Sequence, residues 1–241
     1  MKLFKTTLLF FLVGCTTLAW GRNYSDSVRV YNAGVNGNST TNLLTRLERD
    51  VLSKSPELVV LMVGTNDMLH TDKSLSMAQY EANYQKLISS IRKKSDLVLM
   101  TIPPIYAPYV IQRKPQFNGD EKAPQARVDS ANQVIRRLAA KNKCTLIDLN
   151  AILTACGGAN TDKNSLFQNE ANFNIADGIH PTAAGYQVIA TAVYQTIKGY
   201  KPGVHSVMCF GDSITNGYRI TGQGTTEGDV YPAVLKRMLN L

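Results

Sequence analysis

The sequence of 241 residues is poor in side chains that bind metals. It has three histidines and four cysteines, and none of their spacings resembles a zinc site. No aromatic-basic motif accompanies its positive charge, so a nucleic-acid partner is not expected. We therefore expect a protein whose chemistry does not use a metal ion.

Repeats, low-complexity tracts and runs long enough for several membrane spans are missing as well. With 44% hydrophobic and 18% charged residues, the composition is that of a globular domain. It excludes a disordered tail, a collagen-like chain and a polytopic membrane protein. Acidic residues are the scarcer charge, 18 against 26 basic ones, and the net charge of +8 suggests acidic partners.

The start of the chain has the pattern of a removable leader. Met1–Lys5 is cationic, and the apolar run Leu8–Val13 is too short to span a bilayer. This pattern predicts an exported protein in which residues 1–14 are a signal peptide.

The end of that leader also resembles a bacterial lipobox. In this motif, here Leu12–Cys15, the cysteine is lipidated and becomes the first residue of the mature chain. An ordinary cleavage near Ala19 is the alternative. The lipobox predicts a periplasmic or cell-surface lipoprotein that touches the membrane only through a lipid on Cys15, with residues 15–27 as a tether.

Export changes the interpretation of the other cysteines, because disulfides form outside the cytosol. If Cys15 carries lipid, Cys144, Cys156 and Cys209 remain, and one of them must stay free. Cys209 lies in an apolar run, which favours a buried, inert side chain. Cys144 and Cys156 can pair, but the sequence leaves their geometry open.

Five short apolar runs separate the amphipathic stretches of the chain. They lie at Val28–Tyr31, Leu58–Val63, Leu97–Ile102, Thr145–Leu149 and Val204–Phe210. Continuous apolar runs, rather than alternating ones, are typical of strands buried on both faces, as in a parallel sheet.

Apolar residues at helical spacing occupy the segments between and after these runs. The stripes cover 43–51, 77–91, 128–138 and 186–197, and a last one starts near Tyr231. Alternating strands and helices predict right-handed crossovers. The expected fold is one α/β domain over 28–241, a three-layer α/β/α sandwich with a mostly parallel five-stranded sheet.

Ligands of open parallel sheets bind beyond the carboxyl ends of the strands, and four strand ends carry unusual polar motifs. The last strand ends in Gly211-Asp212-Ser213, where a serine just past a strand can expose its hydroxyl at the sheet edge. A plain turn or helix cap is the alternative for so short a motif.

Two other strand ends offer donors to a developing oxyanion. The side-chain amide of Asn66 can donate such a hydrogen bond, although Asn66 or Asp67 can instead cap the next turn. Gly37 permits a positive φ and leaves backbone N–H groups uncovered. The alternative there is a glycine-rich turn before a helix capped by Ser39 or Thr40.

The fourth motif joins an acid to a base on one short loop. Asp177 and His180 lie three residues apart, followed by Pro181. The Asp177 carboxylate can bind Nδ1 of the imidazole, which leaves Nε2 free to accept a serine proton. A lone loop histidine is more often a surface residue, but this spacing is more specific.

Taken together, the four motifs resemble those of the SGNH or GDSL hydrolase family over roughly residues 28–241. This resemblance implies the flavodoxin-like SGNH hydrolase fold. The G-x-S-x-G elbow of α/β-hydrolases is absent. The matching residues are Gly211-Asp212-Ser213 for the serine block, Gly37 for the glycine block, Asn66 within Gly64–Asp67 for the asparagine block, and Asp177 with His180 for the last block.

The order of the blocks departs from the family, in which the serine block comes first. Here it comes last, and the helix that normally follows it, near Tyr231–Leu235, lies close to the end of the chain. This order predicts a circularly permuted domain, with the family's usual termini joined through Gly199–Gly203. Permutation is tolerated where the native termini are neighbours at the surface.

The resemblance implies hydrolysis of acyl esters without a metal or organic cofactor. Ser213 is the expected nucleophile, His180 the general base, and Asp177 the group that orients the imidazole. The N–H groups of Ser213 and Gly37 and the amide of Asn66 are the expected oxyanion hole. The aspartates beside these residues in the motifs, Asp212 and Asp67, are interpreted as structural.

Substrate choice must come from loops. Ile105–Asp120, with Tyr106, Tyr109 and Phe117, can wall an acyl or sugar pocket. The asparagine-rich Gly157–Asn174 can donate hydrogen bonds to a carbohydrate, and Tyr218–Asp229 follows the nucleophile. Each is equally compatible with an exposed loop.

Short polar loops in an exported enzyme favour hydrolysis of acetyl esters on carbohydrate or similar small substrates. The alternatives are a lysophospholipase or thioesterase-like acylhydrolase, a transferase with the same triad, and a noncatalytic surface-tethered glycan-binding module. The last of these predicts that a triad residue is missing, whereas all three are present.

Overall fold

The computed structural model describes residues 27–120 and 122–241. The expected leader, Cys15 and the expected tether up to residue 26 lie outside these residues. No helix in the described part of the chain is both long and apolar enough to cross a membrane.

Five parallel strands form one sheet in the order β1-β5-β2-β3-β4, which confirms the predicted parallel sheet. Each predicted apolar run overlaps one strand. The fourth strand is shorter than its run because Asp148 caps the helix that follows, accepting a hydrogen bond from the backbone N–H of Ala151. The strands are β1 (Arg29–Gly34), β2 (Leu58–Met62), β3 (Asp96–Met100), β4 (Thr145–Ile147) and β5 (Ser206–Gly211).

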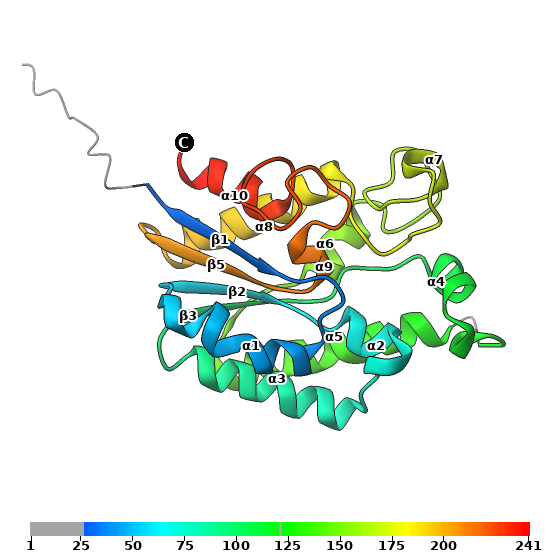
Figure 1. Ribbon diagram of the computed structural model, residues 1–241, viewed down its shortest axis with the longest axis horizontal. Helices are drawn as coiled ribbons and strands as arrows, with labels where there is room; N and C mark the ends of the chain where they lie inside the picture. Colours follow the sequence, from blue (N-terminus) through cyan, green and yellow to red (C-terminus); the bar gives the residue numbers. More distant parts are fainter. Residues whose placement is uncertain (1–26, 121) are drawn as a thin grey trace, which may run out of the picture.

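Helices cover both faces of the sheet, so the predicted three-layer sandwich is confirmed (Figure 1). One layer contains α1 (Thr40–Asp50), α3 (Met77–Ile91) and α5 (Ala123–Asn142); the other contains α6 (Leu149–Ala155), α8 (Ala183–Tyr200) and α10 (Tyr231–Leu239). The shorter α-helices are α2 (Thr65–Leu69), α4 (Ala107–Arg113), α7 (Glu170–Phe173) and α9 (Ser213–Asn216), and single 3₁₀ turns occupy Leu52–Lys54, Thr71–Lys73 and Pro115–Phe117.

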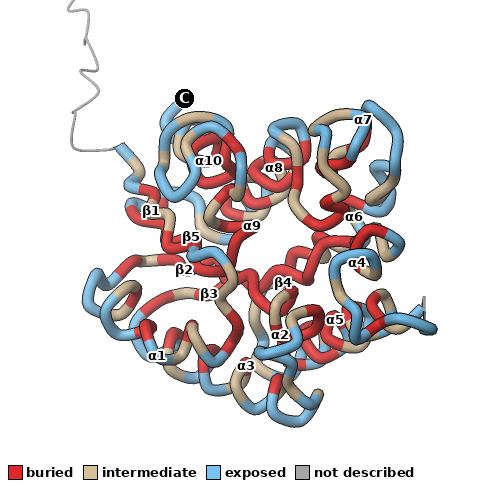
Figure 2. Tube along the Cα trace, turned by 45° about the vertical axis from the view of Figure 1, so that its right-hand side comes forward, coloured by how far each residue is buried: buried red, intermediate tan, exposed pale blue. Residues whose placement is uncertain are grey.

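The strand β5 lies inside the core, between β1 and β2. All six of its residues are buried, because it has β1 and β2 as neighbours and a helical layer on each face. The strands and the inner faces of the helices form most of the buried interior, while the outer faces of the helices and many of the outlying loops are exposed (Figure 2). Full burial of one large apolar side chain contributes roughly 1.5–3 kcal/mol, so this central strand is a major source of stability.

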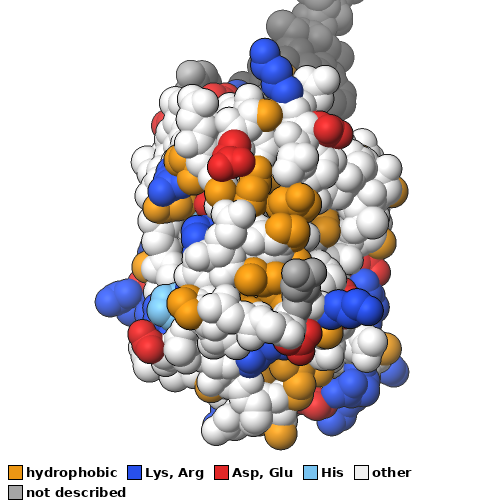
Figure 3. Space-filling view, turned by 90° about the vertical axis from the view of Figure 1, so that its right-hand side faces the viewer, with side chains coloured by type: hydrophobic (Ala, Val, Ile, Leu, Met, Phe, Trp, Pro, Cys, Tyr) orange, Lys and Arg blue, Asp and Glu red, His pale blue; other side chains and the backbone are white. Residues whose placement is uncertain are grey.

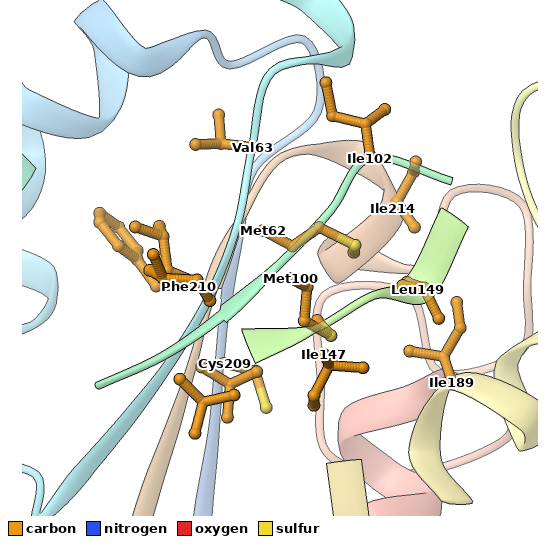
Figure 4. Packing of buried hydrophobic residues seen from close by; sticks show 14 of the residues in the cluster. Met62, Val63, Met100, Ile102, Ile147, Leu149, Ile189, Cys209, Phe210 and Ile214 are labelled. Carbon is orange, nitrogen blue, oxygen red and sulfur yellow. The ribbon is translucent and has the colours of Figure 1, made fainter. Parts of the chain in front are cut away.

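Side chains from neighbouring strands continue one another across the sheet. Met100 of β3 is in register with Ile147 of β4, and both lie near Met62 of β2 (Figure 4). Ile189 of α8 and Leu149 pack beyond them, while Phe210 lies on the opposite side of the sheet (Figure 4). Both faces of the sheet are therefore apolar, as the continuous hydrophobic runs predicted.

The start of β1 is hydrogen-bonded to the end of α10. The backbone N–H of Val28 donates to Oδ1 of Asn240 at 2.8 Å, and Nδ2 of Asn240 donates to the carbonyl of Val28 at 3.1 Å. Figure 1 shows the C-terminus beside the start of β1. Segments more than two hundred residues apart in the chain are therefore direct neighbours.

This contact predicts that the chain can be reconnected. A variant that begins at Gly203, runs to Leu241, continues through a short glycine linker into Val28 and ends at Lys201 should fold to the same sheet. Its free energy of unfolding should lie within about 2 kcal/mol of that of the unrearranged domain, because only one loop is opened and one short loop closed. Circular dichroism and urea unfolding measure this, and loss of cooperative unfolding would contradict the expectation.

Candidate active site

The predicted site residues meet at the edge of the sheet where the strands end. Figure 3 shows the molecule from this side, where hydrophobic and basic side chains share the surface. A cavity of about 360 Å³ opens here, and its lining includes Ser213, His180, Asp177, Gly37 and Asn66. The structure thus brings together residues that come from four separate segments of the chain.

Three of these residues form a continuous chain of hydrogen bonds. Nε2 of His180 lies 2.9 Å from Oγ of Ser213, and Nδ1 of His180 lies 2.9 Å from both carboxylate oxygens of Asp177. An ionised carboxylate only accepts hydrogen bonds, so Nδ1 must carry the proton and Nε2 is left with a lone pair. Nε2 can therefore accept the proton of the Ser213 hydroxyl.

The Asp177 carboxyl is held in its charged form. Burial alone raises its pKa, but hydrogen bonds from the His180 ring and from the backbone N–H groups of His180 and Ile179 outweigh burial and lower the pKa to about 2. The carboxylate is therefore ionised at any pH near neutrality. It fixes both the orientation and the tautomer of the imidazole.

Ser213 is positioned by the close packing of the end of β5 against β2 and Thr215. It begins α9 immediately after β5, and Asp212 caps this short helix through a hydrogen bond from the N–H of Ile214 to Oδ1 at 2.9 Å. A Cβ atom on Gly211 would lie 2.3 Å from the carbonyl oxygen of Met62 and 2.3 Å from Oγ1 of Thr215. Only glycine allows the strand to end at this spacing, so the serine motif requires its first residue.

Gly37 and Asn66 line the same cavity as Ser213. The φ of Gly37 is +73°, a conformation that other residues adopt at a cost, and its carbonyl accepts a hydrogen bond of 2.5 Å from Nζ of Lys73. Nδ2 of Asn66 donates to the carbonyl of Asn38 at 3.0 Å. Since an amide nitrogen has two hydrogens, Asn66 keeps a second donor for a ligand.

The sequence also allows these two motifs to serve as helix caps, and this alternative is confirmed after Gly37 but not at Asn66. Ser39 is the N-cap of α1, so a helix start does follow the glycine-rich turn, as predicted. The helix α2 instead begins at Thr65 with Gly64 as N-cap, so the idea that Asn66 or Asp67 caps it is wrong.

A buried guanidinium connects the segment that carries Ser213 with the segment that carries Gly37. Arg46 of α1 donates from Nη1 to the carbonyl of Ala33, from Nη2 to the carbonyl of Gly211 and from Nε to Oδ1 of Asn38, at 3.0, 2.7 and 2.7 Å. It thereby joins the ends of β1 and β5 to the loop that carries Gly37. Nothing in the sequence distinguishes this arginine from the others.

Both motif aspartates are buried behind the site. Asp67 accepts hydrogen bonds from the backbone N–H and the hydroxyl of Thr40, which joins α2 to the start of α1. Burial raises the pKa of Asp212 to about 7, the charge of Asp67 adds to this rise, and Arg46 acts against it. Neither aspartate is part of the hydrogen-bond chain from Ser213 to Asp177.

The three predicted substrate loops contribute unequally to the cavity. The segment 105–120 lines it through Arg113 and Lys114, and the third loop lines it through Tyr218 and Arg219. Within 105–120, residues 107–113 form α4, the rings of Tyr109 and Phe117 are buried in the protein, and none of the three predicted aromatic residues lines the cavity. No residue of 157–174 lines the cavity either. The side chain of Asn169 instead donates to the carbonyls of Asn160 and Asp162, so this loop uses its amides to stabilise itself.

The cysteines follow the sequence analysis in part. Cys209 is fully buried in β5, as predicted. Cys144 and Cys156 are not paired, and all three cysteines of the described residues have free thiols.

Several site residues were not recognised from the sequence. Arg113 at the end of α4 and Arg219 each have an Nη1 atom about 4 Å from Oδ2 of Asp177. The ring of Tyr218, in the third predicted loop, lies 4.7 Å from the imidazole of His180. Gln168 donates to the carbonyls of Pro181 and Tyr218 and so joins the histidine loop to this tyrosine.

A serine, a histidine and an aspartate in one hydrogen-bond chain at the edge of a parallel sheet have the arrangement of a serine hydrolase site. The chain belongs to the GDSL-like lipase/acylhydrolase family, whose sequence model matches residues 14–188. The match ends before β5 and the serine motif.

Three relatives illustrate this membership. An acetylxylan esterase of Geobacillus stearothermophilus is 26% identical over 70% of this chain and 72% of its own, and the esterase TesA of Pseudomonas aeruginosa is 27% identical over 70% of each. The crystal structure of the acetyl xylan esterase AlAXEase is 28% identical, with a TM-score of 0.54 over 68% of this chain and 79% of its own. The protein is thus a carboxylic ester hydrolase of the GDSL type.

The raised pKa of Asp212 predicts a specific dependence of stability on pH. Because the folded chain holds a proton up to about pH 7 that the unfolded chain releases near pH 3.8, stability from this group is present at low pH and is lost as pH rises through this window. Asp212→Asn keeps the cap acceptor and removes the charge. The variant should gain stability over wild type between pH 5 and pH 8, on the order of 1–4 kcal/mol.

Urea unfolding at these two pH values measures the gain. Asp129→Asn, at an exposed position of α5, is the matched control and should leave the pH dependence as it is. Parallel stability curves for wild type and Asp212→Asn would show that Asp212 does not titrate in this range.

Proposed function

We propose that Ser213, His180 and Asp177 are the catalytic triad of a serine esterase. The observation that carries the proposal is the unbroken chain of 2.9 Å contacts from Oγ of Ser213 through the imidazole to Asp177, open to the cavity. In the first half of the reaction, Oγ bonds to the acyl carbon while Nε2 takes the serine proton. The ester bond then breaks, and His180 returns the proton to the leaving alcohol.

The second half releases the acyl group with the same residues. A water molecule gives a proton to Nε2 of His180 and bonds to the acyl carbon. The bond to Ser213 then breaks, a carboxylic acid leaves, and Oγ regains its proton. Throughout both steps Asp177 stabilises the imidazolium without being protonated itself, which its low pKa favours.

In this proposal the oxyanion is held by the N–H groups of Ser213 and Gly37 and by the second amide hydrogen of Asn66. Their support is positional, since all three residues line the same cavity. Removing one donor of this kind costs about 10²–10³-fold in rate.

We propose acetyl esters of carbohydrate as the substrate class. The cavity is small, about 360 Å³, and much of its lining is polar. Two of the relatives are named as acetylxylan esterases, which act on an acetylated polysaccharide by their names. Among the described residues, the aliphatic side chains in the lining are those of Leu69 and Ile179, so the cavity offers a long acyl chain little apolar surface.

We also propose that the domain is a circular permutant within its family. The hydrogen bonds between Val28 and Asn240 support this, because they join the segments that a common ancestor would have had in sequence. The family match over residues 14–188, which leaves out the serine motif, agrees with a rotated order.

Replacing the nucleophile tests the triad. Ser213→Ala should lower kcat/KM for 4-nitrophenyl acetate by at least about 10³-fold, because no other group can form the acyl-enzyme. Thermal unfolding should be nearly unchanged, since the substitution removes one oxygen atom. Activity that persists in a correctly folded Ser213→Ala variant would exclude Ser213 as the nucleophile.

A series of model esters tests the acyl group. The proposal predicts that kcat/KM falls from 4-nitrophenyl acetate to the octanoate by about tenfold or more, because the cavity lining offers the added methylene groups few aliphatic side chains to pack against. A rise along the series would instead favour a lysophospholipase or thioesterase-like enzyme.

A further inference from the structure

The cavity beside Ser213 carries an excess of positive charge. Arg113, Lys114 and Arg219 line it, and the one acidic side chain in its lining, among the residues that the structure describes, is Asp177. Lys73 adds a further cation next to it through its bond to Gly37. A neutral substrate would give these charges no partner.

Asp177 offsets at most one of the two arginine charges, because its single negative charge is shared by ion pairs with both of them. Its carboxylate oxygens already accept hydrogen bonds from His180 and Ile179. Nη1 of Arg113 and Nη1 of Arg219 lie 3.9 and 4.0 Å from Oδ2, which is beyond hydrogen-bond distance. One positive charge of the two is therefore left without a counter-charge in the cavity lining, and Nη1 of each arginine makes no hydrogen bond to a described residue.

Arg219 is held in place without using its donors. Its guanidinium stacks on the ring of Tyr218 at 4.8 Å, and its side chain makes no hydrogen bond to any described residue. The side chain is 37% exposed at the mouth of the cavity. Its backbone has a φ of +63°, which costs energy for a residue other than glycine and is typically retained where function needs it.

Arg113 is the last residue of α4. It donates from Nη2 to the backbone carbonyl of Asp177 and from Nε to the carbonyl of Tyr109, so its position is fixed by the backbone. The adjacent Lys114 has a lowered pKa, first because of burial and then because of the charge of Arg113, while Asp72 acts in the opposite direction. The local field is therefore positive on this side as well.

We propose that Arg219 and Arg113 bind a carboxylate on the alcohol part of the substrate, which makes the enzyme specific for acyl esters of acidic sugars such as uronates. This inference rests on the proposed function, because the two arginines flank His180, and His180 returns its proton to the leaving alcohol. Gly37 and Asn66, the proposed oxyanion donors, line the same cavity as the arginines. The planar guanidinium matches a carboxylate with two parallel hydrogen bonds, which a neutral hydroxyl cannot supply.

A matched pair of substrates tests this assignment. One is the methyl glycoside of O-acetylated glucuronic acid, and the other is its carboxamide, which keeps the shape and loses the charge. Wild type should prefer the acid by at least about tenfold in kcat/KM, and the preference should shrink when salt is raised to about 0.5 M.

Variants assign this preference to Arg219. Arg219→Gln should remove most of it, and Arg219→Lys, which keeps the charge but not the two-pronged geometry, should retain part of it. Arg137→Gln, the same substitution on the outer surface of α5, is the control and should keep the full preference. Thermal unfolding of each variant shows whether it is folded.

The outcomes separate this inference from the proposed function. Equal rates on the acid and the carboxamide, or a full preference in folded Arg219→Gln, would overturn the carboxylate site while leaving the triad intact. A wild-type preference for acetyl glycerol phosphate over the acetylated uronate would also overturn it, in favour of a phosphate. Activity retained in Ser213→Ala would instead overturn the proposed function itself.

Discussion

The buried guanidinium of Arg46 holds the geometry on which the site depends. It donates to the carbonyls at the ends of β1 and β5, and so keeps Ser213 at a fixed distance from the loop that carries Gly37. The same side chain holds Asn38, whose carbonyl positions Asn66. A charge this deeply buried is stable only when its hydrogen bonds are satisfied, and here backbone carbonyls and Asp50 supply the partners. Arg46 therefore positions both the proposed nucleophile Ser213 and the residues proposed to bind the oxyanion, without contacting either of them directly.

The sequence predicts the layers of this fold well, because a sheet covered by helices on both faces requires strands that are apolar at every position. A strand such as β2, with helices on both faces, must be apolar at every position, and Leu58–Met62 is. The prediction fails for α4, which has only two buried residues, Tyr109 and Val110, and so shows no helical stripe. The order of the strands is likewise not visible locally, because β5 pairs with β1 across most of the chain.

Some residues of the candidate site were likewise recognisable from the sequence, and others were not. Ser213, Asp177 and His180 were recognisable because their chemistry depends on spacing within short motifs, and the fold brings these motifs together. Arg113, at the end of α4, and Arg219, in the loop after α9, come from separate segments and carry no local signal. The asparagines of 157–174 show the opposite error: their composition suggests a ligand, but Asn169 and Asn172 bond to the loop's own backbone. Polar composition cannot distinguish a side chain that binds a ligand from one that closes a turn.

The central position of β5 has a consequence for how the protein acquires its structure. No strand pairing joins β1 directly to β2; both pair with β5, which is the last strand in the chain. As the chain emerges from the ribosome, β2, β3 and β4 can associate, but β1 has no partner until residues 206–211 have been made. Closing the sheet then requires contacts between segments far apart in sequence, which are slow to form because a long loop must be ordered first. Until that moment, the unpaired edges of β1 and β2 are exposed surfaces for aggregation or for a chaperone, and the nucleophile has no scaffold.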